Sequence, residues 1–170
     1  MRDPRFDRLA ETLTGHSTEL KRNEKVLIEA FDAPDEIMIA LIRAARKRGA
    51  IPFVQLQRAP VSRELALHAT ESQLRLLARH ELARMKQIDA YIAVRGSHNI
   101  TEQADVPTNQ MKLIAKKMRP VQDQRVQKTK WVVLRWPTPA MAQLASMSTE
   151  PSKIFSSKFA RSITASFSRE

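Results

Sequence analysis

The sequence predicts an α/β fold, an open and mostly parallel sheet flanked by helices. Short apolar runs rich in β-branched residues, typical of buried strands, alternate along the chain with longer amphipathic stretches typical of helices. Near the start, a strand, a helix and a second strand follow one another within about thirty residues, the spacing of a βαβ unit with parallel strands. This alternation runs on without an internal repeat, which favours a doubly wound sheet.

The first helix is expected over residues 3–14. Asp3 can cap its N-terminus, Pro4 fits the first helical position, and Gly15 is expected to end it. A polar turn then leads to the first predicted strand, residues 25–31, which is apolar and contains β-branched side chains.

The second helix is expected between Asp32 and Gly49. Asp32 is the predicted N-cap, with Pro34 in the first turn, and Gly49 is the predicted stop after a basic last turn. The apolar run that follows, residues 51–56, is the second predicted strand.

Residues 61–86 have a helical pattern. A short piece reaches His68, and Thr70 is then expected to cap a longer helix, with Gln73 at the capping-box position. The predicted buried stripe of the longer helix is Leu74, Leu77, Ala78, Leu82 and Met85. The third predicted strand, residues 88–95, follows and breaks at Gly96.

The last predicted elements follow a loop at residues 99–105. A helix begins near Pro107, and Pro120 is expected to end or kink it because proline lacks the amide hydrogen of the helical ladder. The side chains expected to face inward are Met111, Ile114, Ala115 and Met118. Residues 130–136 form the fourth predicted strand and residues 138–146 a short helix.

Composition narrows the class of protein. A chain of 170 residues with 42% hydrophobic content can bury the core of a single domain. The absence of cysteine excludes a disulfide framework and a thiolate metal site. The N-terminal residues have no apolar signal segment, and no run approaches the length of a membrane span, so we expect a cytoplasmic protein.

The net charge of +11 raises the possibility of nucleic-acid binding. The Lys and Arg residues are, however, spread over the faces of several predicted helices, and aromatic residues make up only 5% of the chain. That is too few for a base-stacking surface. Solvated helix faces are therefore the favoured interpretation, and we do not expect nucleic acid as a partner.

A possible pocket rim lies where the third strand ends. Ligands of open α/β sheets collect beyond the carboxyl ends of the strands, so Ser97, His98 and Asn99 are the candidate site residues. His98 and Glu102 would share one side of this loop if it were helical, but two groups do not make a two-metal site. A loop or interface role for His98 is favoured over a metal or substrate ligand. The chain has no nucleophile-elbow motif and no glycine-rich phosphate loop.

The two tryptophans flank the fourth strand. Trp131 and Trp136 are five residues apart, so they point to opposite faces of a strand. The favoured interpretation is one core anchor and one surface or interface aromatic. The alternative makes Trp136 part of a docking surface for another domain.

Five segments, in collinear order over about residues 2 to 150, resemble one known family. They are RFDRLAETL (residues 5–13), EKVLIEA (24–30), YIAVRGSHNITE (91–102), TKWVVLRWPTP (129–139) and MAQ (141–143). The chain resembles the thermophilic aminopeptidases, leucyl-type exopeptidases that use two metal ions.

The resemblance implies that residues 1–149 are the N-terminal α/β domain of a two-domain enzyme. In that family a larger second domain supplies Glu, His, Asp and Tyr ligands to a divalent metal (Zn, Co or Mg), peptides are the substrates, and a homodimer encloses the active site. None of those ligand motifs occurs in this sequence. We therefore expect no catalytic residue, no metal ligand and no cofactor in this chain, and no activity from it alone.

Residues 150–170 depart from the family resemblance and are rich in Ser and Lys. Back-translation with permitted codons, shifted by one base, gives an acidic, aromatic sequence that resembles the family's helix at this point. We therefore predict a single-base deletion near the Glu150 codon, which would make the tail frameshifted, aberrant and poorly ordered, and the chain a truncated fragment.

Two other functions stay open on the sequence. One is a non-catalytic binding module whose partner is a polyanion or a homologous subunit. The other is a small α/β enzyme that uses the loop around His98.

Overall fold

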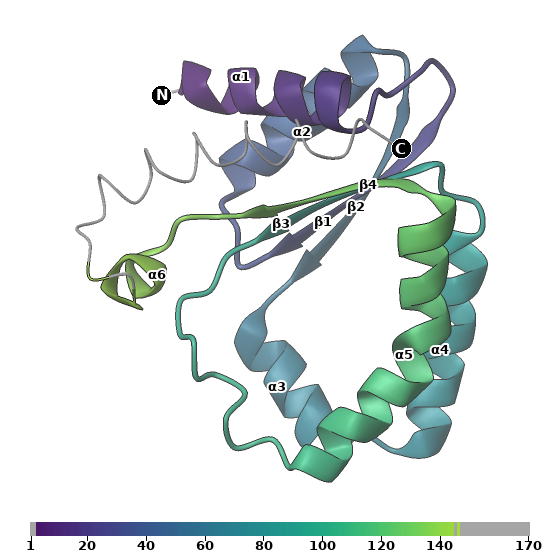
Figure 1. The fold of residues 1–170 in the computed structure, drawn as a ribbon, viewed down its shortest axis with the longest axis vertical. Coiled ribbons are helices and arrows are strands. Elements are labelled where there is room, and N and C mark those ends of the chain that lie inside the picture. Colours follow the sequence, from purple (N-terminus) through teal and green to yellow (C-terminus); the bar gives the residue numbers. More distant parts are fainter. Residues whose placement is uncertain (1–2, 145, 147–170) are drawn as a thin grey trace.

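The computed structural model describes residues 3–144 and residue 146. Its centre is a four-stranded, fully parallel sheet in the order β2-β1-β3-β4 (Figure 1). The strands are β1 (Lys25–Phe31), β2 (Ile51–Gln57), β3 (Ala90–Arg95) and β4 (Lys130–Arg135). Helices cover both faces, so the predicted α/β class and parallel sheet are confirmed.

The first face of the sheet is apolar and packs against α1 (Pro4–Thr12) and α2 (Asp35–Lys47), which lie together above it in Figure 1. The strand residues in this larger core cluster are Val26, Ile28, Ala30, Ala90, Ile92, Val94 and Leu134. They alternate along each strand, as expected when one side chain in two points to a given face.

The second face packs against α4 (Glu71–Met85) and α5 (Thr108–Lys128), which contact each other. Its core cluster is smaller: Leu27, Met85, Ile88, Tyr91, Ala93 and Val121. The helix α3 (Ala59–Leu67) lies below the sheet and contacts α5, and α6 (Pro139–Leu144) follows β4. Among the described residues, no helix is both long and apolar enough to cross a bilayer.

Strand order creates a switch point between β1 and β3. From β1 the chain crosses to β2 on one side, then returns past β1 to place β3 on the other. The chain leaves β1 for α2 on the first face and leaves β3 for α5 on the second face, so the switch point lies where open α/β sheets bind ligands.

Several predicted caps are confirmed. The Asp3 carboxylate accepts a hydrogen bond from the Arg5 amide at 2.8 Å, and the Thr70 hydroxyl accepts one from the Gln73 amide at 3.3 Å. Gly49 follows the last turn of α2 at a φ of +74°, the left-handed conformation that favours glycine.

Two predicted helix boundaries are wrong. Gly15 does not end the first helix, because the chain continues as a π-helical turn over Leu13–Ser17. Asp32 does not cap α2. Pro34 is the N-cap residue, and the Asp32 carboxylate instead accepts hydrogen bonds from the Ala59 amide at 3.2 and 3.3 Å.

Some side chains predicted to be inward are exposed. Leu77 is 46% exposed and Met111 39% exposed, and Ala115 is exposed as well. The predicted stripe of α4 loses Leu77, and its buried or half-buried members are Leu74, Ala78, Leu82 and Met85. Pro120 does not end α5, which continues to Lys128, although the helix axis changes direction along its length in Figure 1.

The two tryptophans divide as the favoured interpretation predicts. Trp136 is half-buried and packs edge-on against Phe6, with ring centroids 5.3 Å apart, whereas Trp131 is 37% exposed. This packing gives no support to Trp136 as part of a docking surface. Exposed apolar side chains lie instead on the edge strand β2 and on α3: Ile51, Phe53, Val54, Leu56, Val61 and Leu65.

Candidate functional site

The carboxyl ends of β1 and β3 are held together by the backbone. The Gly96 amide donates to the Phe31 carbonyl at 2.7 Å, which extends the strand pairing by one residue beyond β3. A Cβ atom added at Gly96 would lie 2.5 Å from the Asp32 carbonyl oxygen, too close for any other side chain. Gly96 is therefore required where the loop that follows β3, which carries the predicted rim, approaches the loop that follows β1.

Replacing Gly96 with Ala should destabilise the fold by about 1–3 kcal/mol, because the added methyl group meets backbone that cannot rotate away. Gly15→Ala is the matched control. There the added atom would meet the tip of the Arg48 side chain, which can move, so we expect a change of less than about 1 kcal/mol. Urea unfolding of the two variants measures the difference, and equal free energies of unfolding would contradict the close approach.

The rim residues form a self-bonded loop. The Ser97 hydroxyl donates to the Asn99 carbonyl at 3.0 Å, and the Asn99 side-chain oxygen accepts from the Thr101 amide at 3.1 Å. The Asn99 amide group donates to the Glu102 carboxylate at 2.9 Å. The polar atoms of Ser97 and Asn99 thus organise the loop itself, in the manner of an Asx turn.

His98 and Asn99 are exposed, and Ser97 is half-buried. Glu102, which could have shared a metal with His98 in a helical loop, is engaged with Asn99, and residues 100–105 are turns. Over residues 3–144 and 146 the structure contains no group of three or more His, Cys, Asp or Glu side chains that could hold a metal ion.

The loop is also anchored to its neighbours. The Arg63 guanidinium of α3 donates to the Asp105 carboxylate, with Nε to Oδ1 at 2.9 Å, and holds the pKa of Asp105 below its usual value. The Thr138 hydroxyl, just before α6, donates to the Ser97 carbonyl. These contacts fix the rim in place without using the side chain of His98.

A buried polar network, which we call the Glu29 network, lies beside the rim on the second face of the sheet. Glu29 of β1 has only 8% of its side chain exposed. It accepts hydrogen bonds from the Tyr91 hydroxyl, from the Gln57 amide at 2.9 Å and from the Arg95 guanidinium at 3.3 Å. Arg125 of α5 approaches the same carboxylate at 4.0 Å.

Tyr91 is enclosed by this network. The residue is 1% exposed, and the Arg125 guanidinium stacks over its ring, 4.2 Å from the ring centre. Burial, reinforced by the negative charge of Glu29, raises the pKa of the Tyr91 hydroxyl to about 12. The hydroxyl is therefore neutral at physiological pH and acts as a hydrogen-bond donor.

The Glu29 network was missed by reasoning from the sequence. Part of its signal is present, because Glu29 is the acidic residue inside an apolar strand, and Tyr91 and Arg95 are four residues apart on one strand face. The register that places Glu29 beside them depends on strand order, which local patterns do not reveal.

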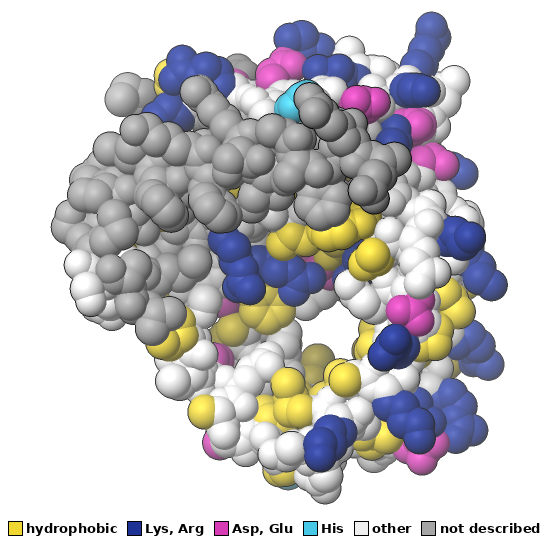
Figure 2. Space-filling view, viewed as in Figure 1, with side chains coloured by type: hydrophobic (Ala, Val, Ile, Leu, Met, Phe, Trp, Pro, Cys, Tyr) yellow, Lys and Arg dark blue, Asp and Glu magenta, His cyan; other side chains and the backbone are white. Residues whose placement is uncertain are grey.

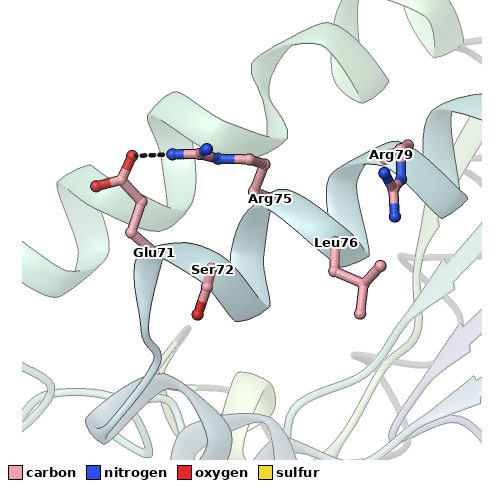
Figure 3. Close-up of a pocket in the computed structure, with 5 residues that line it drawn as sticks. All are labelled: Glu71, Ser72, Arg75, Leu76 and Arg79. Atoms are coloured by element: carbon pink, nitrogen blue, oxygen red, sulfur yellow. Dashed lines mark hydrogen bonds and ion pairs between the residues drawn. The ribbon is translucent and has the colours of Figure 1, made fainter.

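A shallow depression lies away from both features. Figure 3 shows its lining residues, Glu71, Ser72, Arg75, Leu76 and Arg79, along a single helix, α4. Glu71 and Arg75 form an ion pair there at 3.0 Å, one helical turn apart. No candidate rim residue contributes to this depression.

The comparisons with known proteins give one family and one fold. The family model described as thermophilic metalloprotease (M29) matches residues 2–165, somewhat further than the resemblance over residues 2 to 150. The structure of wild-type AmpT from Thermus thermophilus is similar, with a TM-score of 0.71 and 18% sequence identity. That match covers 92% of this chain and 42% of the AmpT chain. A search of curated proteins found no match.

Proposed function

The chain belongs to the thermophilic metalloprotease (M29) family, and from this premise we propose that residues 1–149 are the N-terminal α/β domain of a metal-dependent aminopeptidase. In this proposal the residues that bind the metal and the peptide lie in another part of the full-length protein. These 170 residues alone do not release N-terminal amino acids from peptides.

The observation that carries the proposal is the family match over residues 2–165, combined with the fact that this chain covers less than half of the matched AmpT structure. The chain spans 42% of the length of AmpT. A metal-dependent peptidase needs several carboxylates and imidazoles that converge on the ions, and the described residues contain no such group.

An aminopeptidase assay tests the proposal. The purified chain, supplied with cobalt, zinc or magnesium, should not release the N-terminal residue from leucyl or other aminoacyl substrates. An intact member of the family in the same assay serves as the positive control. Metal-dependent release of the N-terminal residue by this chain, at a rate above the metal-only blank, would refute the proposal that the metal-binding residues lie outside it.

The remaining parts of the proposal concern the metal, substrates, assembly and cellular location of the full-length protein. It uses a divalent metal (Zn, Co or Mg), acts on peptide substrates, assembles as a homodimer and functions in the cytoplasm, with neither a membrane nor nucleic acid as a partner. In that assembly the loop of Ser97, His98 and Asn99 forms at most one wall of a pocket. The polar side-chain atoms of Ser97 and Asn99 already form hydrogen bonds within the loop.

The tail is proposed to be the product of a frameshift. Residues 150–170 lie outside the described part of the chain. Sequencing of the genomic DNA decides the matter, because the proposal requires a catalytic reading frame immediately downstream in another phase. Absence of such a reading frame would refute the proposed frameshift.

A binding module remains the second candidate function, with a polyanion or a homologous subunit as its partner. The feature that favours a polyanion is the excess of basic residues, many of which lie over α4 and α5 at the right of Figure 2. Several of them are already paired, such as Lys117 with Glu71 at 2.6 Å. An electrophoretic shift of DNA or RNA that weakens with salt would support this function.

A further inference from the structure

Two arginines lie side by side at the carboxyl ends of β3 and β4. Arg95 and Arg135 are register partners in the parallel pairing of these strands. Leu134 belongs to the core of the first face, so Arg135, the next residue, points to the second face, where Arg95 contacts Glu29. Like charges on directly opposed strand residues repel each other, so this pair costs stability unless an anion lies near it.

The surrounding charges do not balance the pair. Arg125 of α5 brings a third guanidinium to the same region. Among the described residues, Glu29 is the only carboxylate that pairs with any of these three arginines, at 3.3 Å from Arg95 and 4.0 Å from Arg125. One carboxylate facing three guanidiniums leaves an excess of positive charge.

Glu29 also accepts hydrogen bonds from donors other than arginine. Its two oxygens accept from Tyr91 and from Gln57, in addition to Arg95. Arg125 has a buried Nε atom with no hydrogen-bond partner among the described residues. Donor capacity on the guanidiniums therefore exceeds the acceptors that the Glu29 network provides.

The arginine pair is accessible. Arg135 is exposed, and 39% of the Arg95 side chain is exposed. Figure 2 shows a hollow below the sheet, between α3 and the α4 and α5 helices, with Lys and Arg side chains along its upper edge. The pair lies on this face of the sheet, at the carboxyl ends of its strands, where ligands of open α/β sheets bind.

We propose that Arg95 and Arg135 together bind an oxyanion, the carboxylate or phosphate group of a small ligand, in this hollow. A planar guanidinium donates two parallel hydrogen bonds to such a group, and two adjacent guanidiniums clamp it from both sides. The bound anion also relieves the repulsion between the arginines. This site is separate from the proposed peptidase function and does not depend on it.

The test is a titration with inorganic phosphate at constant ionic strength, followed by the NMR signals of the arginine Nε–H groups and of the amides of residues 95–97. Wild type should show saturable binding. Arg135→Gln should weaken it about tenfold or more, because a charge-assisted hydrogen bond pair is lost. The Arg135 side chain is exposed and forms no hydrogen bond or ion pair with a described residue, so this variant should fold normally.

The matched control is Arg43→Gln. Arg43 is an exposed residue of α2, on the other side of the sheet, and its replacement removes the same charge. It should leave the phosphate affinity within about twofold, because distant exposed charges are screened. Equal weakening by both variants, unchanged affinity in Arg135→Gln, or no saturable binding to wild type would each overturn the proposal.

A dipeptide and its C-terminal amide distinguish the two sources of the anion. Binding of the free acid Leu-Gly, with loss of binding for its amide, assigns the site to a carboxylate ligand. Tighter binding of phosphate than of the dipeptide, together with equal affinity for acid and amide, assigns it to a phosphate group.

Discussion

Replacing Glu29 with Ala should destabilise the fold by about 3–5 kcal/mol, one of the largest effects available from a single side chain in this protein. The carboxylate is the acceptor at the centre of the Glu29 network, and its removal leaves the Tyr91 hydroxyl and the Gln57 amide without their acceptor. Arg95 loses its carboxylate partner and keeps a hydrogen bond to the Tyr91 hydroxyl oxygen at 3.3 Å. The cost is mainly that of uncompensated positive charge and unsatisfied donors in a mostly buried place.

Two further variants separate charge from packing. Glu29→Gln keeps the shape and one acceptor oxygen but removes the charge, so we expect a smaller loss, about 1–3 kcal/mol. Glu64→Ala removes an exposed carboxylate on α3 that lies 3.7 Å from Arg63, and should change stability by less than about 0.5 kcal/mol. Urea unfolding measures all three. A loss for Glu29→Ala no larger than that for Glu64→Ala would show that the network contributes nothing.

Tyr91 should make the fold sensitive to alkaline pH. Its pKa in the folded chain is raised from 10.0 to about 12, so the folded state holds the phenolic proton more tightly than the unfolded state. The resulting stability is fully present below pH 10 and is lost as the pH rises from 10 through 12. A shift of this size corresponds to about 2–3 kcal/mol.

The titration can be observed without interference, because Tyr91 is the only tyrosine in the sequence. Tyrosinate absorbance of the folded chain should report a midpoint well above that of the urea-unfolded chain. The variant Tyr91→Phe should be less stable than wild type near neutral pH, because Glu29 loses a donor, and this difference should shrink between pH 10 and pH 12. A folded-state midpoint near 10 would contradict the burial of the hydroxyl.

The sequence predicted the sheet well where periodicity alone decides the outcome. The strand expected over residues 25–31 is β1 to the residue, and the run at 51–56 is β2 with one residue added. The caps at Asp3 and Thr70 are also local, since each side chain bonds an amide two or three residues away.

The errors come from tertiary contacts that override local preference. Asp32 has the residue type of a helix cap, but its carboxylate bonds the Ala59 amide across the carboxyl end of the sheet, and Pro34 is the N-cap residue of the helix. The Glu29 network joins β1, β2, β3 and α5, with Glu29 and Tyr91 separated by 62 positions in the chain. Such a cluster follows from strand order, which no window of sequence contains.

The candidate rim was also predicted only in part. Its position at the end of β3 followed from the strand and the glycine break, whereas its place beside β1 comes from the strand order of the structure. The internal bonding of Ser97 and Asn99 was not predicted, because it depends on the turn that the loop adopts.

The most direct test of the central claim, that the metal chemistry of the family lies outside these residues, is a measurement of bound metal. The purified chain is equilibrated with cobalt, zinc or magnesium, freed of excess ions by dialysis and analysed for metal content. We predict no stoichiometric retention of any of the three ions, and the same trace level in His98→Ala. Stoichiometric metal in the wild-type chain that is lost in His98→Ala would contradict the account and make the loop a metal site.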